Sequence, residues 1–167
     1  KHTKEIWPNF FIVGAQKSGT TSMYHYLRKN PKIFLSPIKE PAYFSQYRGS
    51  MPFKEHSPTK EQYLELFQNV NNQVIVGEVS TPYLFDPNSA KNIHQVTPDA
   101  KIVIILRDPI ERAYSRYLEN RWDSNLSSFG EEIRKSMDVL NQQYPDPADN
   151  ILYCGLYYLQ VKRYLET

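Results

Sequence analysis

A glycine-rich segment, GAQKSGTT at residues 14–21, carries the residue types that bind phosphate groups in proteins. It follows a short apolar run at residues 9–13 and precedes a stretch with apolar residues at helical spacing. Where a loop joins a strand to a helix, exposed backbone N–H groups and the positive end of the helix dipole point at one place. The segment is therefore predicted to hold a phosphate. The alternative is a glycine turn with a solvated lysine.

This loop differs at one position from the loop of nucleoside triphosphatases and P-loop kinases. Gly14 and Gly19 match the two glycines of the pattern G-x-x-x-x-G-K-[ST], but Thr20 stands where that pattern has lysine. The lysine of this chain, Lys17, lies three positions before that threonine. Only Asp108 follows a predicted strand in a place where it could bind Mg²⁺. We therefore expect a phosphate ligand without the usual metal arrangement.

A second polar group follows the strongest apolar run, at residues 101–106. Arg107 stands at the end of this predicted strand, Asp108 with the proline after it is typical of a helix start, and Ser115 lies two turns into the helix. In open α/β sheets, ligands bind outside the carboxyl ends of the strands, where Arg107 and Ser115 could both face. Alternatively, Arg107 pairs with Asp108 or Glu111, and Ser115 is an ordinary hydroxyl on the helix surface.

The elements that must position these residues alternate along the chain. Apolar runs predict strands at 9–13, 33–35, 74–78 and 101–106, and helical spacing predicts helices at 20–28, 59–67, 109–120, 128–140 and 157–165. Strands that are apolar on both faces favour a parallel sheet covered by helices. The predicted fold class is α/β, a three-layer P-loop-type fold with a central parallel sheet flanked by helices, in a single domain over residues 1–167.

Composition excludes several classes of function. No segment among the 167 residues approaches the ~20 apolar residues of a membrane-spanning helix. A formal net charge of +2 is too small for a nucleic-acid-binding protein. The lone Cys154 excludes an internal disulfide, and the four scattered histidines lack the spacing of a zinc site, so no metal is expected.

The lack of cysteine pairs favours a cytoplasmic setting. Residues 1–7 lack the apolar stretch of a signal peptide, so we expect that any targeting segment was removed or never existed.

Two of these segments together resemble the sulfotransferases that use 3′-phosphoadenosine 5′-phosphosulfate (PAPS). The sequence QKSGTTS at residues 16–22 resembles the loop of that family that binds the 5′-phosphosulfate. The sequence LRDPIERAYS at residues 106–115 resembles its 3′-phosphate motif. The two motifs occur in the order of the family, and the similarity extends from about Asn9 to the end of the chain.

Within the family, the chain is most similar to the heparan sulfate sulfotransferase group and its microbial relatives. The sequence SPIKEPAYF at residues 36–44 resembles the segment that carries the catalytic glutamate of that group. The sequence GEVSTPYL at residues 77–84 resembles the next conserved segment of that group, with Val79 where some members have a lysine near the acceptor.

The resemblance implies transfer of a sulfuryl group from PAPS to a hydroxyl or amine acceptor, for example a carbohydrate. The implied catalytic residues are Lys17, which would neutralise charge as the S–O bond breaks, and Glu40, which would act as general base. The implied donor-binding residues are Lys17, Ser18, Gly19, Thr20, Thr21, Ser22, Arg107 and Ser115. The resemblance also implies a Golgi lumen location if the source is eukaryotic.

Other readings of these residues stay open at this stage. Lys17 could be a surface lysine and Glu40 a solvated carboxylate, and Glu78 is expected to be structural, to touch the acceptor or to order Lys17. Arg112, Arg116 and Arg121 on the long helix are expected to be solvated, or near an anionic acceptor by chance, and not to be catalytic. The alternative functions are a P-loop kinase and a non-catalytic nucleotide-binding module. In the family a later basic loop closes over the nucleotide, and the C-terminal part of the domain is expected to be missing here.

Overall fold

The computed structural model describes residues 5–47, 49, 51–53, 55–120, 127–141 and 150–167. The elements, in chain order, are β1 (Phe10–Gly14), α1 (Thr20–Leu27), β2 (Ile33–Leu35), α2 (Lys60–Glu65), β3 (Ile75–Val79), α3 (Pro82–Phe85), α4 (Ser89–Val96), β4 (Lys101–Ile104), α5 (Pro109–Asn120), α6 (Phe129–Asn141), the 3-10 helix η1 (Tyr153–Gly155) and α7 (Tyr157–Glu166).

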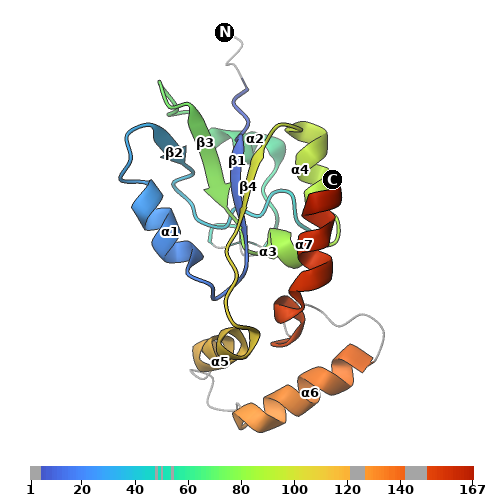
Figure 1. The fold of residues 1–167 in the computed structure, drawn as a ribbon. Coiled ribbons are helices and arrows are strands. Elements are labelled where there is room, and N and C mark those ends of the chain that lie inside the picture. The colour runs from blue at the N-terminus through green and yellow to red at the C-terminus, as the bar shows by residue number, and fades with distance from the viewer. Residues whose placement is uncertain (1–4, 48, 50, 54, 121–126, 142–149) are drawn as a thin grey trace.

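The strands form one parallel four-stranded sheet in the order β2-β3-β1-β4. In the register of the central strand, Phe11 of β1 lies opposite Glu78 of β3 and Ile102 of β4. Figure 1 shows α1 on one face of the sheet and α3, α4 and α7 on the other, with α5 and α6 beyond the carboxyl ends of the strands. The prediction of a three-layer α/β fold with a parallel sheet is confirmed.

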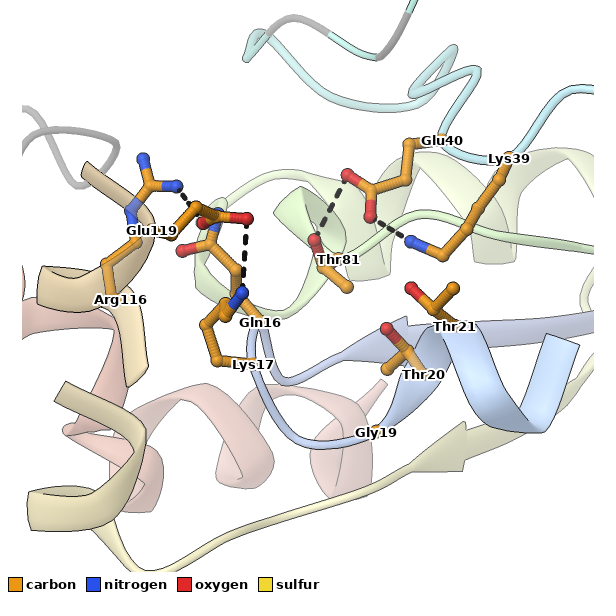
Figure 2. A pocket seen from close by; sticks show the side chains of 10 residues that line it. All are labelled: Gln16, Lys17, Gly19, Thr20, Thr21, Lys39, Glu40, Thr81, Arg116 and Glu119. Carbon is orange, nitrogen blue, oxygen red and sulfur yellow. Dashed lines mark hydrogen bonds and ion pairs between the residues drawn. The ribbon is translucent and has the colours of Figure 1, made fainter. Parts of the chain in front are cut away.

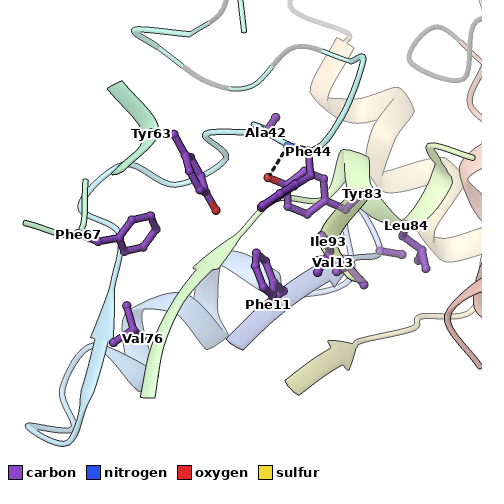
Figure 3. Packing of buried hydrophobic residues seen from close by; sticks show 11 residues of the cluster. Phe11, Val13, Ala42, Phe44, Tyr63, Phe67, Val76, Tyr83, Leu84 and Ile93 are labelled. Carbon is purple, nitrogen blue, oxygen red and sulfur yellow. Dashed lines mark hydrogen bonds between the residues drawn. The ribbon is translucent and has the colours of Figure 1, made fainter. Parts of the chain in front are cut away.

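The core lies on both faces of the sheet because successive residues of β1 point to opposite sides. Phe11 and Val13 point into the larger cluster (Figure 3), which also contains Ala15, Ala42, Phe44, Tyr63, Phe67, Val76, Tyr83, Leu84 and Ile93. Ile12 points the other way, into a smaller cluster with Tyr24, Leu35 and Val79. Fully burying one such side chain contributes about 1.5–3 kcal/mol, so these clusters fix the sheet against the helices.

Two helices begin with side-chain caps, and the sequence predicts the cap at Asp108. Asp108 Oδ1 accepts hydrogen bonds from the backbone N–H groups of Ile110 and Glu111, each at 3.0 Å, and so caps α5. Thr59 caps α2, and its capping-box partner is Gln62. The first of these caps sets the direction in which α5 leaves the carboxyl edge of the sheet.

The sequence patterns miss two helices, α3 and α4. The four residues of α3 begin with a proline and are all buried, so tertiary packing and not helical periodicity stabilises this turn. Helix α4 has only two buried apolar residues, Ala90 and Ile93, among those described. Two apolar positions are too few for a recognisable helical pattern in the sequence. Within the described ranges, no helix is both long and apolar enough to cross a membrane.

The expectation that the arginines of α5 are solvated is wrong for Arg112. Its side chain is fully buried, and Nη2 donates a hydrogen bond to the carbonyl of Ile151. The reason is that η1 covers this face of α5: a Cβ at Gly155 would lie 3.3 Å from Arg112 Nε. Arg116 is partly exposed and pairs with a neighbouring glutamate, whereas Arg121 lies outside the described residues.

Candidate functional site

A pocket of about 400 Å³ opens at the carboxyl edge of the sheet (Figure 2). Four segments that are far apart in the sequence form it: the loop after β1 with the start of α1, the loop after β2, the turn from β3 into α3, and α5. Its lining residues are Gln16, Lys17, Gly19, Thr20, Thr21, Lys39, Glu40, Thr81, Arg116 and Glu119. The topology of the parallel sheet therefore brings the predicted phosphate loop and the predicted base to one place.

The loop after β1 is held in a conformation that favours glycine at two positions. Gly14 has φ 151°, and a Cβ there would lie 2.7 Å from Leu84 Cβ, so α3 can approach the end of β1 only because this residue lacks a side chain. Gly19 has φ 89°, and Lys17 between them also has a positive φ, of 65°. The backbone N–H of Ala15 donates to Ile105 O at 2.7 Å, which ties the loop to the residue after β4.

The loop leaves polar groups available at the start of α1. None of the side chains that the structure describes caps this eight-residue helix, so its first N–H groups can be donated to a ligand. The hydroxyl oxygen of Ser18 is buried, and no hydrogen-bond partner for it occurs in the part of the chain that the structure describes. A buried hydroxyl without a partner costs about 1–3 kcal/mol. These groups fit an anion such as phosphate.

Lys17 is held by an ion pair in the pocket. Its Nζ lies 3.1 Å from Glu119 Oε1, and the other oxygen of Glu119 accepts a hydrogen bond from Arg116 Nη1 at 2.7 Å. Partial burial acts to raise the pKa of Glu119, but the hydrogen bonds from Arg116 and Lys17 and their positive charges outweigh it and lower the pKa. Glu119 therefore occupies, as a carboxylate, the place where the lysine would meet an anionic ligand.

Glu40 lies on the opposite side of the pocket. Its Oε1 pairs with Lys39 Nζ, and its Oε2 accepts a hydrogen bond from Thr81 Oγ1 at 3.2 Å. Its backbone has φ 61°, and its N–H donates to Val79 O at 2.8 Å. Figure 2 shows Lys17 with Glu119 on one side and Glu40 with Thr81 on the other. The space between them can admit a group that both sides contact.

Arg107 and Ser115 lie together in a second hollow, of about 360 Å³, which Glu111 also lines. Arg107 Nε and Nη2 donate to Glu111 Oε2 at 3.2 and 3.1 Å, which is the pairing that the sequence left open as an alternative. Its Nη1 also donates to the backbone carbonyl of Lys17 at 3.3 Å. The second hollow is thus linked directly to the phosphate loop.

The structure places most of the predicted site residues in these two hollows. Five of the predicted residues line the pocket: Lys17, Gly19, Thr20, Thr21 and Glu40. Ser18 lies in the loop without lining either hollow, and Ser22 is exposed on α1. Sequence reasoning missed the other five lining residues, because single polar residues carry no signal until the fold brings them to the sheet edge. These residues are Gln16, Lys39, Thr81, Arg116 and Glu119.

Glu78 lies beneath the pocket and does not line it. It is fully buried, and its carboxylate accepts hydrogen bonds from the hydroxyls of Tyr63 at 2.6 Å, Tyr83 at 2.7 Å and Ser80 at 2.6 Å. Burial away from water raises its pKa from an ordinary 4.5 to about 7, while the three hydroxyls act to lower it and the charge of Glu40 acts to raise it. The sequence signal that could have indicated this buried cluster is the position of Glu78 within an apolar strand segment.

Comparison with known proteins gives consistent results at the levels of family, sequence and structure. A family model described as "Sulfotransferase family" matches residues 8–152. "Membrane-associated sulfotransferase kil1" of Dictyostelium discoideum is 36% identical over 112 residues, which are 66% of this chain and 22% of that protein. "Bifunctional heparan sulfate N-deacetylase/N-sulfotransferase 4" of Mus musculus is 32% identical over 132 residues, 72% of this chain and 15% of that protein.

A solved structure is similar over nearly the whole chain. The crystal structure of a sulfotransferase from Alicyclobacillus acidocaldarius superposes with a TM-score of 0.84 and 38% sequence identity, over 96% of this chain and 69% of that one. By contrast, the chain spans only 15% to 22% of the length of the two curated relatives. The similarity therefore concerns the fold and the family, over a part of the length of the curated relatives.

Proposed function

This chain belongs to the sulfotransferase family, and on that premise we propose that it transfers a sulfuryl group from PAPS to a hydroxyl or amine acceptor, for example of a carbohydrate. The observation that carries the proposal is the placement of Lys17 and Glu40 on opposite sides of one pocket at the carboxyl edge of the sheet. Transfer requires a cation at the leaving phosphate and a base at the acceptor. The donor and the acceptor must also lie in line with each other.

The donor would lie across both hollows. The 5′-phosphosulfate would meet Lys17, Ser18 and Gly19 of the loop and Thr20, Thr21 and Ser22 of α1. It would also meet the first N–H groups of α1, for which the described residues provide no side-chain cap. The 3′-phosphate would bind Arg107 and Ser115, where a planar guanidinium fork suits phosphate oxygens. Arg107 would exchange its exposed pair with Glu111 for this phosphate, at small cost because surface ion pairs contribute little.

In the reaction, the acceptor oxygen or nitrogen forms a bond to sulfur while the bond from sulfur to the phosphate oxygen breaks. The leaving group is adenosine 3′,5′-bisphosphate, which keeps the electron pair of the broken bond. Lys17 would leave Glu119 and neutralise the charge that develops on that oxygen. Glu40 would take the proton of the acceptor, and Thr81 and Lys39 would hold its two oxygens in place until then.

Calorimetric titration tests the donor site. Wild type should bind adenosine 3′,5′-bisphosphate more tightly than 5′-AMP or ATP with Mg²⁺. Lys17→Ala should weaken binding of the bisphosphate by roughly 10- to 100-fold, because it removes a charge-assisted hydrogen bond. The matched control is Lys162→Ala, which removes an exposed lysine of α7 that pairs with Glu166. Preference for ATP with Mg²⁺ would instead indicate a P-loop kinase.

A second measurement tests the base. Glu40→Gln should bind adenosine 3′,5′-bisphosphate like wild type but lose transfer from PAPS to glucosamine and 4-nitrophenol, used as amine and hydroxyl probes. Binding without any transfer by wild type would indicate a non-catalytic nucleotide-binding module.

The cytoplasmic setting stays a prediction, and the relative from Dictyostelium discoideum is named as membrane-associated.

A further inference from the structure

The buried carboxylate of Glu78 is connected to the loop of Glu40 through two hydroxyl groups. Ser80 Oγ donates to Glu78 Oε2 at 2.6 Å and accepts a hydrogen bond from the backbone N–H of Ala42 at 3.0 Å. Tyr83 OH donates to Glu78 Oε1 at 2.7 Å and accepts one from the backbone N–H of Phe44 at 3.3 Å. Both hydroxyls thus lie between the carboxylate and the backbone that carries the proposed base.

The direction of these hydrogen bonds follows from the carboxylate. A hydroxyl has a single proton, and the carboxylate form of Glu78, which predominates above its pKa of about 7, can only accept. Once the protons of Ser80 and Tyr83 are donated to Glu78, the lone pairs of both oxygens are left to accept from backbone N–H groups. A neutral amide in place of Glu78 would present its own donors to these hydroxyls and disturb this arrangement.

The loop needs such anchors because its backbone is strained. Glu40 has φ 61° and Ala42 has φ 54°, and neither is glycine. A non-glycine residue in this region costs of order 1–3 kcal/mol and persists only where its surroundings hold it. The two hydroxyl contacts lie at Ala42 and at Phe44, which are two and four residues after Glu40.

We propose that Glu78 is a positioning residue for Glu40, which it places by fixing the hydroxyls of Ser80 and Tyr83 as acceptors for the backbone N–H groups of the following loop. The inference rests on the role proposed above for Glu40 as general base. It assigns no contact with substrate to Glu78, which is fully buried.

Tyr63 provides a matched control. Its hydroxyl donates to the same oxygen of Glu78, at 2.6 Å against 2.7 Å for Tyr83, but it has no hydrogen bond to the loop among those of the described residues. Tyr63→Phe and Tyr83→Phe therefore each remove one hydroxyl from Glu78 and keep the ring. Only Tyr83→Phe also removes the acceptor for Phe44.

Amide hydrogen exchange measured by NMR in the full chain tests the positioning directly. We expect Tyr83→Phe to speed exchange at Phe44 by about tenfold, and Ser80→Ala to do the same at Ala42, relative to amides of β1. Tyr63→Phe should speed neither. Glu78→Gln should speed both, and this variant tests Glu78 itself once its cooperative unfolding shows that it is folded. The tyrosine variants test whether the hydroxyl of Tyr83 holds the loop, and no change at Phe44 in Tyr83→Phe would also overturn the inference.

Transfer from PAPS to glucosamine and 4-nitrophenol provides the second measurement. Tyr83→Phe and Ser80→Ala should lower kcat about tenfold without changing the affinity for adenosine 3′,5′-bisphosphate, while Tyr63→Phe keeps the kcat of wild type. Equal exchange at Phe44 and equal kcat in the two tyrosine variants would overturn the inference. If wild type neither binds the bisphosphate nor transfers, the proposed function fails, and the exchange rates at Ala42 and Phe44 still decide whether Glu78 positions the loop.

Discussion

The carboxyl of Glu78 combines full burial with three hydroxyl donors, and this combination has a consequence for stability. The groups that face it are the hydroxyls of Tyr63 on α2, Ser80 after β3 and Tyr83 on α3, with the charge of Glu40 nearby. Burial, together with the charge of Glu78, raises the pKa of both tyrosines well above its ordinary value, so they stay protonated at neutral pH. Glu78 is then the group of this cluster that titrates near pH 7.

We predict that Glu78 makes the protein more stable in mild acid than at pH 8. In the unfolded chain its carboxyl has its ordinary pKa of 4.5, and in the folded protein a pKa of about 7. Between these values the folded protein holds a proton that the unfolded chain has released, so the free energy of unfolding falls as pH rises. The fall is up to about 3 kcal/mol, and it is nearly complete about one pH unit above the folded pKa, near pH 8.

Urea unfolding of wild type and Glu78→Gln at pH 5 and pH 8 measures this effect. The free energy of unfolding of wild type minus that of the variant should decrease from pH 5 to pH 8, because the amide does not titrate. The exposed Glu166→Gln serves as control and should leave the pH dependence of wild type unchanged. A difference between wild type and Glu78→Gln that stays constant or grows with pH would contradict the prediction.

At the scale of elements, substitutions at two helix caps distinguish an effect on stability from an effect on ligand binding. Asp108 caps α5, which carries Ser115 and Glu119 at the two hollows, whereas Thr59 caps α2, away from them. Asp108→Ala and Thr59→Ala should each lower the free energy of unfolding by about 1 kcal/mol, since each leaves helix N–H groups without a partner. Only Asp108→Ala should also weaken binding of adenosine 3′,5′-bisphosphate, because the start of α5 positions Arg107.

Urea unfolding and calorimetric titration of the two variants test this pair. Equal bisphosphate affinity in both would show that Arg107 and Ser115 do not depend on the start of α5. Weaker binding in Thr59→Ala would show that the loss reflects general destabilisation, because Thr59 is not among the described residues that line the two hollows.

The sequence predicts the strands, the parallel sheet and the phosphate loop because each rests on a local pattern. The apolar run at residues 9–13 and the glycines after it are contiguous, and so are the run at 101–106 and the cap at Asp108. What the sequence misses depends on neighbours from elsewhere in the chain. Arg112 is buried because η1 lies over it, and α3 is helical because all of its residues are buried.

At the scale of the whole molecule, the site joins segments that are distant in sequence at one edge of the sheet. The loop at residues 16–21, Glu40, and α5 line the pocket, and Arg107 bonds to the carbonyl of Lys17. A ligand that contacts all of these segments must stabilise the fold, because it binds the folded state and not the unfolded chain.

We predict that adenosine 3′,5′-bisphosphate at 100 times its Kd raises the free energy of unfolding by about 2.7 kcal/mol. Thermal unfolding should show the Tm of wild type rising with bisphosphate concentration. The same concentrations should raise the Tm of Lys17→Ala and Arg107→Ala much less. An unchanged Tm in wild type, with binding seen by calorimetry, would mean that the unfolded chain binds equally well.

The loop that carries Glu40 is held from outside over its whole length. Ala42 and Phe44 are bonded to Ser80 and Tyr83, and farther along the loop Ser45 Oγ and the backbone N–H of Gln46 both donate to the buried Asp86, at 2.7 and 2.8 Å. In evolutionary terms, the position of the proposed base depends on residues outside its own loop, in the turn from β3 into α3. Beyond Gln46 the chain returns to the base, since a Cβ at Gly49 would clash with the carbonyl oxygen of Glu40. A substitution at Gly49 in a descendant of this scaffold would therefore move the proposed base itself.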